Sequence, residues 1–321
     1  MNAMGVIFAL LTTLSWSIGI FPFTTAARRL GVEPLNHFRL ALATVILSFI
    51  AILTTREGLS GLFEMNMLHA WMWLGLSGVI GLTIGDHFGF AGFVILGPRL
   101  GSVLSTFAPG ATLLLGYFLT NDRLNWIGIT GMLTTMFGVI VLSLSREERN
   151  LHEPSAHGSL LKGVIYGILA AFCQGAGLVM AKKGMEITSA SKSLLPPFQA
   201  TFIRLSSATF SIYLISAMTG KLRKILRPVV DNKQGGIKPA IIGTIFGPVT
   251  GVSLSLFTVS LLNPSVAQTI FSLVPVVALL IAMLFYREPV RPKAMAGVIV
   301  AITGVVLLVW RESIERFIHQ L

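Results

Sequence analysis

Charged residues and cysteine are both scarce in this chain of 321 residues. Asp, Glu, Lys and Arg together make up 12% of it, about half the share that is usual in soluble domains. So few charges cannot cover the surface of the two soluble domains that the length would otherwise suggest. The one cysteine, Cys173, excludes a disulfide within the chain, and its apolar neighbours favour a packing role. The histidines are not spaced as metal ligands, and the sequence contains no DxxxD or HExxH motif, so no cofactor is expected.

Long apolar runs are what the chain has in abundance. Hydrophobic residues make up 54% of it, and the mean hydropathy is +0.80. The runs do not alternate as barrel strands do, and they recur at the length of about 20 residues that a membrane-spanning helix needs. We therefore expect an all-α polytopic membrane protein with ten transmembrane helices. The expected spans are 4–27, 34–53, 69–96, 98–120, 124–145, 160–181, 197–218, 237–262, 264–286 and 293–310.

The net charge of +11 comes from 24 Lys and Arg against 13 Asp and Glu. In a membrane protein such an excess is typical of cytoplasmic loops, so we expect membrane lipids as neighbours and no nucleic-acid partner. The loop at 219–236 is the most basic, which places it in the cytoplasm and both termini outside. The first span lacks the basic flank and cleavage site of a signal peptide and is read as a retained helix.

The two halves of the sequence repeat each other. A shift of 166 residues lays Pro98 on Pro264 and Pro109 on Pro275, a shift of 165 lays Phe38-Arg39-Leu40 on Ile203-Arg204-Leu205, and a shift of 158 lays the GVIF at Gly5 on GVIY. We expect a first five-helix repeat at 1–145, a polar linker at 146–159, a second five-helix repeat at 160–311 and a short tail at 312–321. Because five is odd, the second repeat enters the membrane from the opposite side, which makes an inverted repeat.

A second set of matched residues resembles the EamA type of the drug/metabolite transporter superfamily. In each half, a proline in the fourth helix is followed by an apolar run, an acidic turn and a fifth helix with two glycines. These residues are Pro109, Asp122, Gly131 and Gly138 in the first repeat, and Pro275, Glu288, Gly297 and Gly304 in the second. The resemblance implies export or uptake of small metabolites, most often amino acids. It also implies that both termini are cytoplasmic, against the charge distribution, so both orientations stay open.

One departure from related small multidrug resistance proteins bears on the mechanism. Their proton- and drug-binding glutamate lies in the first helix, where this chain reads TTLSWSIG and, in the second repeat, AAFCQGAG. The mechanism based on that acid is therefore not expected here.

The two prolines point to candidate cavity faces. Each proline lacks an N–H, so we expect Pro109 to free the carbonyl of Ser105, and Pro275 to free that of Phe271. The polar residues Ser102, Thr106, Gln268 and Ser272 lie at matching offsets and would face a central cavity. The alternative is a kink that neighbouring helices pack against.

Ionisable residues inside the spans are further candidates. Asp86 and His87 are expected as a buried pair, whose carboxylate would carry a proton or meet a substrate amine; the alternative is an ion pair of Asp86 with Arg39 or Arg204. The two arginines would each hold a substrate carboxylate, or else extend to lipid headgroups.

Three further sets of residues complete the candidates. Trp16 and its counterpart Gln174 would line the cavity or pack elsewhere. The acids Asp122 and Glu288 are expected to act locally in their turns. Small residues every four positions, from Ser77 to Gly89 and from Gly243 to Ser255, are typical of close helix packing.

The expected function is that of a secondary transporter in the plasma (inner) membrane, working as a monomer or homodimer. It would move a small polar metabolite, an amino acid or a related compound, by alternating access in the direction of export, with coupling to a proton or ion. We expect no enzymatic activity. The alternative is an integral membrane enzyme that acts on a lipid-linked substrate.

Overall fold

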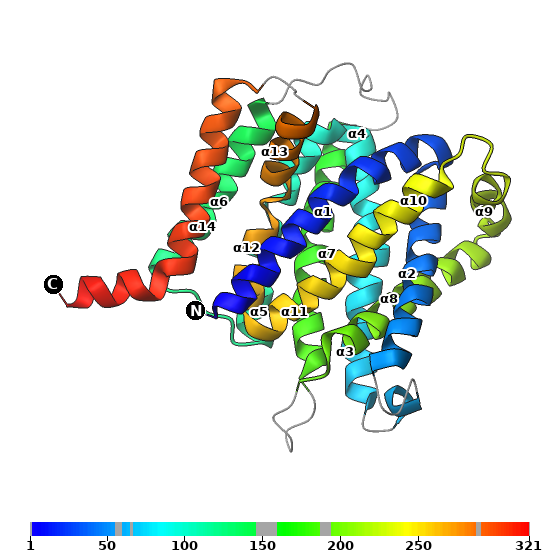
Figure 1. The fold of residues 1–321 in the computed structure, drawn as a ribbon, viewed down its shortest axis with the longest axis horizontal. Coiled ribbons are helices and arrows are strands. Elements are labelled where there is room, and N and C mark those ends of the chain that lie inside the picture. Colours follow the sequence, from blue (N-terminus) through cyan, green and yellow to red (C-terminus); the bar gives the residue numbers. More distant parts are fainter. Residues whose placement is uncertain are drawn as a thin grey trace.

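Apolar helices long enough to cross a bilayer make up the computed structural model, which describes residues 2–54, 60–64, 67–145, 159–186, 194–286 and 290–320. Within these ranges ten helical spans meet the length and hydropathy of a membrane crossing, five in each half of the chain. They form one bundle, with the N- and C-termini on the same side in Figure 1. The prediction of an all-α polytopic fold with two five-helix repeats is confirmed.

Several spans contain more than one helical element. The first repeat comprises α1 (Ala3–Leu30), α2 (Val32–Thr54), η1 (Ser60–Phe63), α3 (Leu68–Gly78), η3 (Val79–Ile84), α4 (Gly85–Ser105), α5 (Ala108–Leu119) and α6 (Trp126–Ser145). The second comprises α7 (Leu160–Met185), α8 (Pro197–Met218), α9 (Leu222–Asp231), α10 (Ile237–Thr244), η4 (Ile245–Val252), α11 (Ser253–Leu261), α12 (Pro264–Phe271), α13 (Val274–Tyr286) and α14 (Pro292–His319).

Local sequence explains where several helices begin and end. The Asn2 side chain accepts a hydrogen bond from the backbone N–H of Met4 at 3.0 Å and so caps α1. Gly31 ends that helix with φ at +93°, a conformation that costs glycine little. Gly97, with φ at +76°, separates the third span from the fourth. Ser159 caps α7; it is the one residue of the predicted 146–159 linker that lies inside the described ranges.

The fourth span of each repeat is broken before its proline. α4 ends at Ser105 and α5 begins at Ala108, so Pro109 lies in the first turn of a new helix, where its missing N–H costs little. The second repeat has the same break between α12 and α13, before Pro275. Each proline therefore follows an interruption of two residues, which falls at the same place in the fourth span of both repeats.

Two π-helical segments occupy equivalent places in the two repeats. η3 begins at Val79 in the third span, and η4 begins 166 residues later at Ile245 in the eighth. A π-turn holds an extra residue and is frequent at functional sites. Asp86 follows η3 closely, and its counterpart Val252 is the last residue of η4.

The first helix of each repeat packs against the other repeat. α1 lies along α10, η4, α11, α12 and α13, while α7 lies along α3, η3, α4 and α5. Two equivalent glycine pairs mark these crossings. A Cβ on Gly81 would lie 3.4 Å from the Cα of Gly177, and a Cβ on Gly19 would lie 3.5 Å from the N of Gly247. The repeats therefore interlock through a pseudo-two-fold relation.

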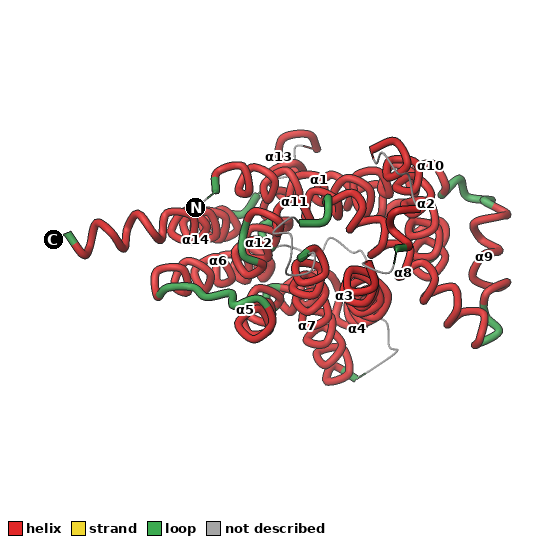
Figure 2. Tube along the Cα trace, turned by 90° about the horizontal axis from the view of Figure 1, so that it is seen from below, coloured by secondary structure: helices red, strands yellow, loops and turns green. Residues whose placement is uncertain are grey.

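The fifth helices of the two repeats, α6 and α14, pair along one edge of the bundle, as Figure 2 shows from below. The predicted glycines face each other across this pair. A Cβ on Gly131 would lie 2.8 Å from the carbonyl oxygen of Gly304, and a Cβ on Gly138 would lie 2.7 Å from that of Gly297. These four glycines let the two backbones touch. α14 continues to His319, so the predicted tail at 312–321 largely extends the last helix.

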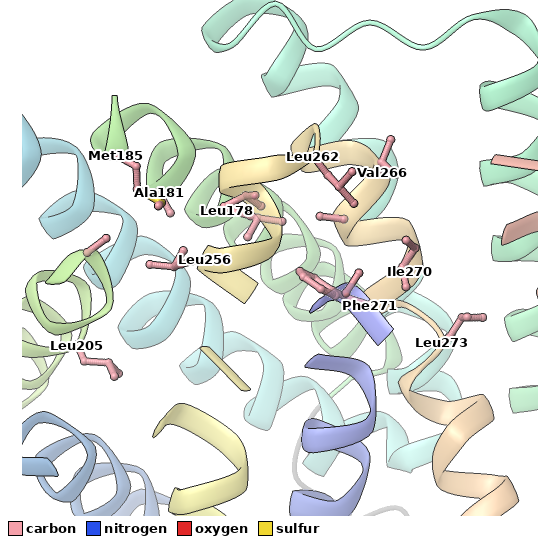
Figure 3. Close-up of a cluster of buried hydrophobic side chains, with 14 of the residues drawn as sticks. Leu178, Ala181, Met185, Leu205, Leu256, Leu262, Val266, Ile270, Phe271 and Leu273 are labelled. Atoms are coloured by element: carbon pink, nitrogen blue, oxygen red, sulfur yellow. The ribbon is translucent and has the colours of Figure 1, made fainter. Parts of the chain in front are cut away.

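Thr44 of α2 contacts Thr209 of α8, the residue that is equivalent to it in the second repeat. Their hydroxyl oxygens are 2.8 Å apart, within hydrogen-bonding distance. Buried apolar side chains from both repeats form the main core, and Figure 3 shows the part of it where α7, α8, α11 and α12 meet. The side chains labelled there are Leu178, Ala181, Met185, Leu205, Leu256, Leu262, Val266, Ile270, Phe271 and Leu273.

The basic loop at 219–236 contains a short helix of its own, α9. It lies outside the bundle, at the opposite end from α14 in Figures 1 and 2. Its buried Ile225 faces the bundle, whereas Arg223, Lys224 and Arg227 are exposed. This distribution is typical of a helix that lies in a membrane interface.

Candidate functional site

An ion pair joins the second and third spans of the first repeat. Arg39 of α2 and Asp86 of α4 form a salt bridge, in which their side chains are 14% and 15% exposed. Arg39 Nε also donates a hydrogen bond to Asn36 Oδ1 at 2.7 Å. Its guanidinium carbon lies 5.8 Å from the ring centroid of Phe23 and 5.6 Å from that of Phe90. Arg39 is thus fully engaged inside the protein and does not extend to a headgroup.

His87 does not join this pair. Its side chain is exposed, and its ring lies 5.8 Å from that of Phe88, in an edge-on arrangement. The prediction of a buried Asp86 and His87 pair is therefore wrong. Consecutive residues on a helix point about 100° apart, so Asp86 turns into the bundle while His87 turns away from it.

Arg204 of α8 occupies the place in the second repeat that Arg39 occupies in the first. It is 6% exposed, so it does not extend to a headgroup either. Its Nη2 lies 3.1 Å from where a Cβ on Gly81 would be, and 3.4 Å from that of Gly177. Its Nε is buried and has no hydrogen-bond partner among the described residues. Asp86 is the acid whose charge acts on this guanidinium.

The hydroxyls near the two helix breaks turn toward their own backbone. Thr106 Oγ1 donates to the carbonyl oxygen of Val103 at 2.6 Å, and Ser272 Oγ donates to that of Thr269 at 2.6 Å. Thr106 is buried, and Ser272 is half-buried. These bonds satisfy part of the last turn before each break. Ser102 and Gln268, the other two predicted residues, are both half-buried.

Hydroxyls of α1 satisfy further carbonyls beside the break between α12 and α13. Thr13 Oγ1 donates to the carbonyl oxygen of Ile270 at 3.2 Å, and Ser17 Oγ donates to that of Val274 at 3.1 Å. α1 thus satisfies the carbonyls of Ile270 and Val274, while the expectation for the carbonyls of Ser105 and Phe271 stays a prediction. The clustered Ser and Thr of TTLSWS were the signal in the sequence that could have found these contacts.

Trp16 and Gln174 lie in different surroundings. The Trp16 ring packs edge-on against Phe271, with centroids 5.1 Å apart, and its indole edge fills the space beside Gly251. Gln174, on α7, has an exposed side chain. Trp16 thus packs between the repeats, close to the break before Pro275.

Asp122 has a role that the sequence did not predict. It is 1% exposed, and its Oδ2 accepts a hydrogen bond from the backbone N–H of Ser265 at 2.8 Å. This carboxylate therefore caps α12 in the other repeat, and the expected local role in a turn is wrong. Its counterpart Glu288 lies outside the described residues.

A groove of about 710 Å³ lies between α3 and α8. Its walls include the exposed side chains of Met72 and Phe210, so it faces outward from the bundle. None of the predicted site residues lines it. We therefore place the candidate site at Arg39, Asp86 and Arg204, where ionisable groups of both repeats meet inside the membrane span.

Comparisons with known proteins agree with this architecture. The model of the EamA-like transporter family matches residues 3–144 and 161–310, one match for each repeat. No curated protein matches the chain. Among solved structures, 28 chains match. One of them is the crystal structure of a protein whose sequence is 14% identical to this chain. The two structures match with a TM-score of 0.67 over 96% of each chain. That similarity shows the shared fold. Since the family model covers both repeats, the chain is a multi-pass membrane protein that belongs to the EamA-like transporter family.

Proposed function

We propose that the protein exports a small polar metabolite, such as an amino acid, across the plasma membrane by alternating access. The observation that carries this proposal is the pair of equivalent crossings, Gly81 with Gly177 and Gly19 with Gly247. Each crossing joins the first helix of one repeat to the third span of the other. Because the two crossings are related by the repeat, exchanging their local conformations would give a second state that opens to the other side.

Asp86 is the proposed coupling group. It is an ionisable residue inside a span, partly exposed, and it is paired with Arg39. Protonation of its carboxylate would weaken the link between α2 and α4 and free Arg39. A proton gradient would thereby bias the bundle between its two states.

Transport by purified protein in sealed vesicles tests the proposal. Vesicles would be loaded with a panel of labelled amino acids, and efflux would be followed with and without an imposed pH gradient. We expect gradient-dependent efflux of at least one compound. A Gly81→Leu variant, which fills the crossing against Arg204 and Gly177, should lose it. A Gly110→Ala variant is the matched control, because a Cβ there meets nothing within 4 Å.

The alternative function, an enzyme acting on a lipid-linked substrate, predicts a different result in the same vesicles. A water-soluble headgroup product would accumulate without a gradient, and no labelled compound would cross. That outcome would contradict the transporter proposal.

A further inference from the structure

Arg39 and Arg204 occupy equivalent positions in the two repeats, but the groups that surround them differ. Arg39 has a hydrogen-bond acceptor, a carboxylate and two aromatic rings around it. The corresponding residues of the second repeat supply none of these groups. Asn36 is replaced by Thr201, Asp86 by Val252, Phe23 by Ala181 and Phe90 by Leu256.

None of these replacements offers Arg204 a substitute. The hydroxyl of Thr201 already donates to the carbonyl oxygen of Pro197 at 2.6 Å, so it is turned back along its own helix. Val252, Ala181 and Leu256 are buried apolar residues. Asp86, whose charge acts on Arg204, already forms a salt bridge with Arg39, so Arg204 has no salt bridge of its own among the described residues. A buried charge without a partner of its own is costly, and an ionisable residue inside a membrane span is a functional candidate.

The protein nevertheless makes room for this guanidinium. Nη2 of Arg204 lies 3.1 Å from where a Cβ on Gly81 would be and 3.4 Å from that of Gly177, so the two glycines leave it space that a larger side chain would occupy. The position is the crossing of η3 and α7, where the two repeats meet. Arg204 therefore lies at the helix crossing that would change conformation in the proposed transport cycle. Its Nε is buried and has no hydrogen-bond partner among the described residues.

The charges of the site define the ligand. Arg39 and Asp86 neutralise each other, and Arg204 leaves one positive charge. A guanidinium binds a carboxylate through two parallel hydrogen bonds, and the pairing is strong where water is excluded. We propose that Arg204 binds the carboxylate group of a small organic acid or amino acid, and that this group supplies in the second repeat the negative charge that Asp86 supplies in the first. This inference rests on the proposed function and gives its substrate class.

Binding by the purified protein in detergent tests this assignment without any gradient. Thermal unfolding would be followed with L-alanine, L-phenylalanine, L-lactate and benzoate, with the primary amide of each, and with chloride. We expect at least one carboxylate to raise the unfolding temperature, while its amide and chloride do not. Arg204→Gln should weaken that binding about tenfold or more, since a charge-assisted bond is lost.

Val252→Asp gives a sharper test, because it places an acid at the position equivalent to Asp86. We expect this variant to unfold at a higher temperature than the parent and to lose the response to carboxylates, since Arg204 then has an internal counter-ion. In the Arg204→Gln background the same change should be destabilising. Val276→Asp, at an equally buried valine of α13, should destabilise the protein in both backgrounds.

The two proposals fail in different ways. If no carboxylate gives a shift that its amide lacks, or if Val252→Asp destabilises the protein as Val276→Asp does, the Arg204 site is refuted, whatever the vesicles show. If carboxylates bind through Arg204 but no compound crosses sealed vesicles, the site stands and the transport function is refuted.

Discussion

Replacing Gly138 with alanine should loosen the pairing of α6 with α14. A Cβ at this position would lie 2.3 Å from the backbone N of Ala301 and 2.7 Å from the carbonyl oxygen of Gly297. Ordinary contact between such atoms needs about 3.5 Å, so the helices would have to separate by about 1.2 Å. Both obstacles are backbone atoms, so rotation of a side chain cannot relieve the overlap.

The cost follows from that separation. Even a gap of about 0.5–1 Å forfeits about a quarter to a half of the dispersion energy between facing atoms, and overpacking typically costs about 1–3 kcal/mol. Against this, alanine in a helix is favoured over glycine by about 0.5–1 kcal/mol. We expect a net loss of about 1–2 kcal/mol in the free energy of unfolding. Gly110→Ala should give a small gain, since a Cβ there meets nothing within 4 Å.

Unfolding by SDS in mixed micelles, followed by tryptophan fluorescence, measures both variants. The double variant with Gly297→Ala provides a second test, because a Cβ on Gly297 would lie 2.8 Å from the carbonyl oxygen of Gly138. Once one alanine has separated the helices, the second should cost less than it does alone. If Gly138→Ala is as stable as Gly110→Ala, or if the two losses simply add, the glycine contact does not hold the helices together as argued.

Three other predictions concern single residues. Asp122→Ala should lower the free energy of unfolding by about 1–2 kcal/mol, because it leaves the N–H of Ser265 without its cap. Asp122→Asn should lose less, since it keeps an acceptor, and equal losses would contradict a capping role. Asp86→Asn should abolish the pH dependence of efflux while the protein still folds; an unchanged pH profile would rule out Asp86 as the proton carrier. In a background without the native cysteine, Ser102→Cys and Gln268→Cys should react with water-soluble thiol reagents in opposite conformational states, and protection of both in every state would remove these faces from the pathway.

The spans could be predicted closely from sequence because hydropathy and length depend on local composition. The boundary near Gly97 and the glycine faces of α6 and α14 agree with the expected repeat. The π-helices could not be predicted in this way, since an extra residue in one turn leaves hydropathy unchanged.

Tertiary contacts account for the predictions that failed. Asp122 sits in a short turn beside an arginine, which suggests a local pair, but its partner is the N–H of Ser265, 143 residues away. Repeat symmetry identified Arg39 and Arg204 as equivalent, yet only the three-dimensional arrangement showed that one is satisfied and the other is not. An identical residue in two aligned helices does not have an identical environment when its neighbours have diverged.

The packing of the first helix of each repeat against the other repeat has a consequence for biosynthesis. α1 leaves the ribosome well before the elements it packs against, from α10 to α13, which begin only at Ile237. Until then its polar face, with Thr13 and Ser17, has no partner carbonyls from the second repeat. The first repeat therefore cannot complete its own packing, and the two halves must finish folding together after most of the chain has been inserted.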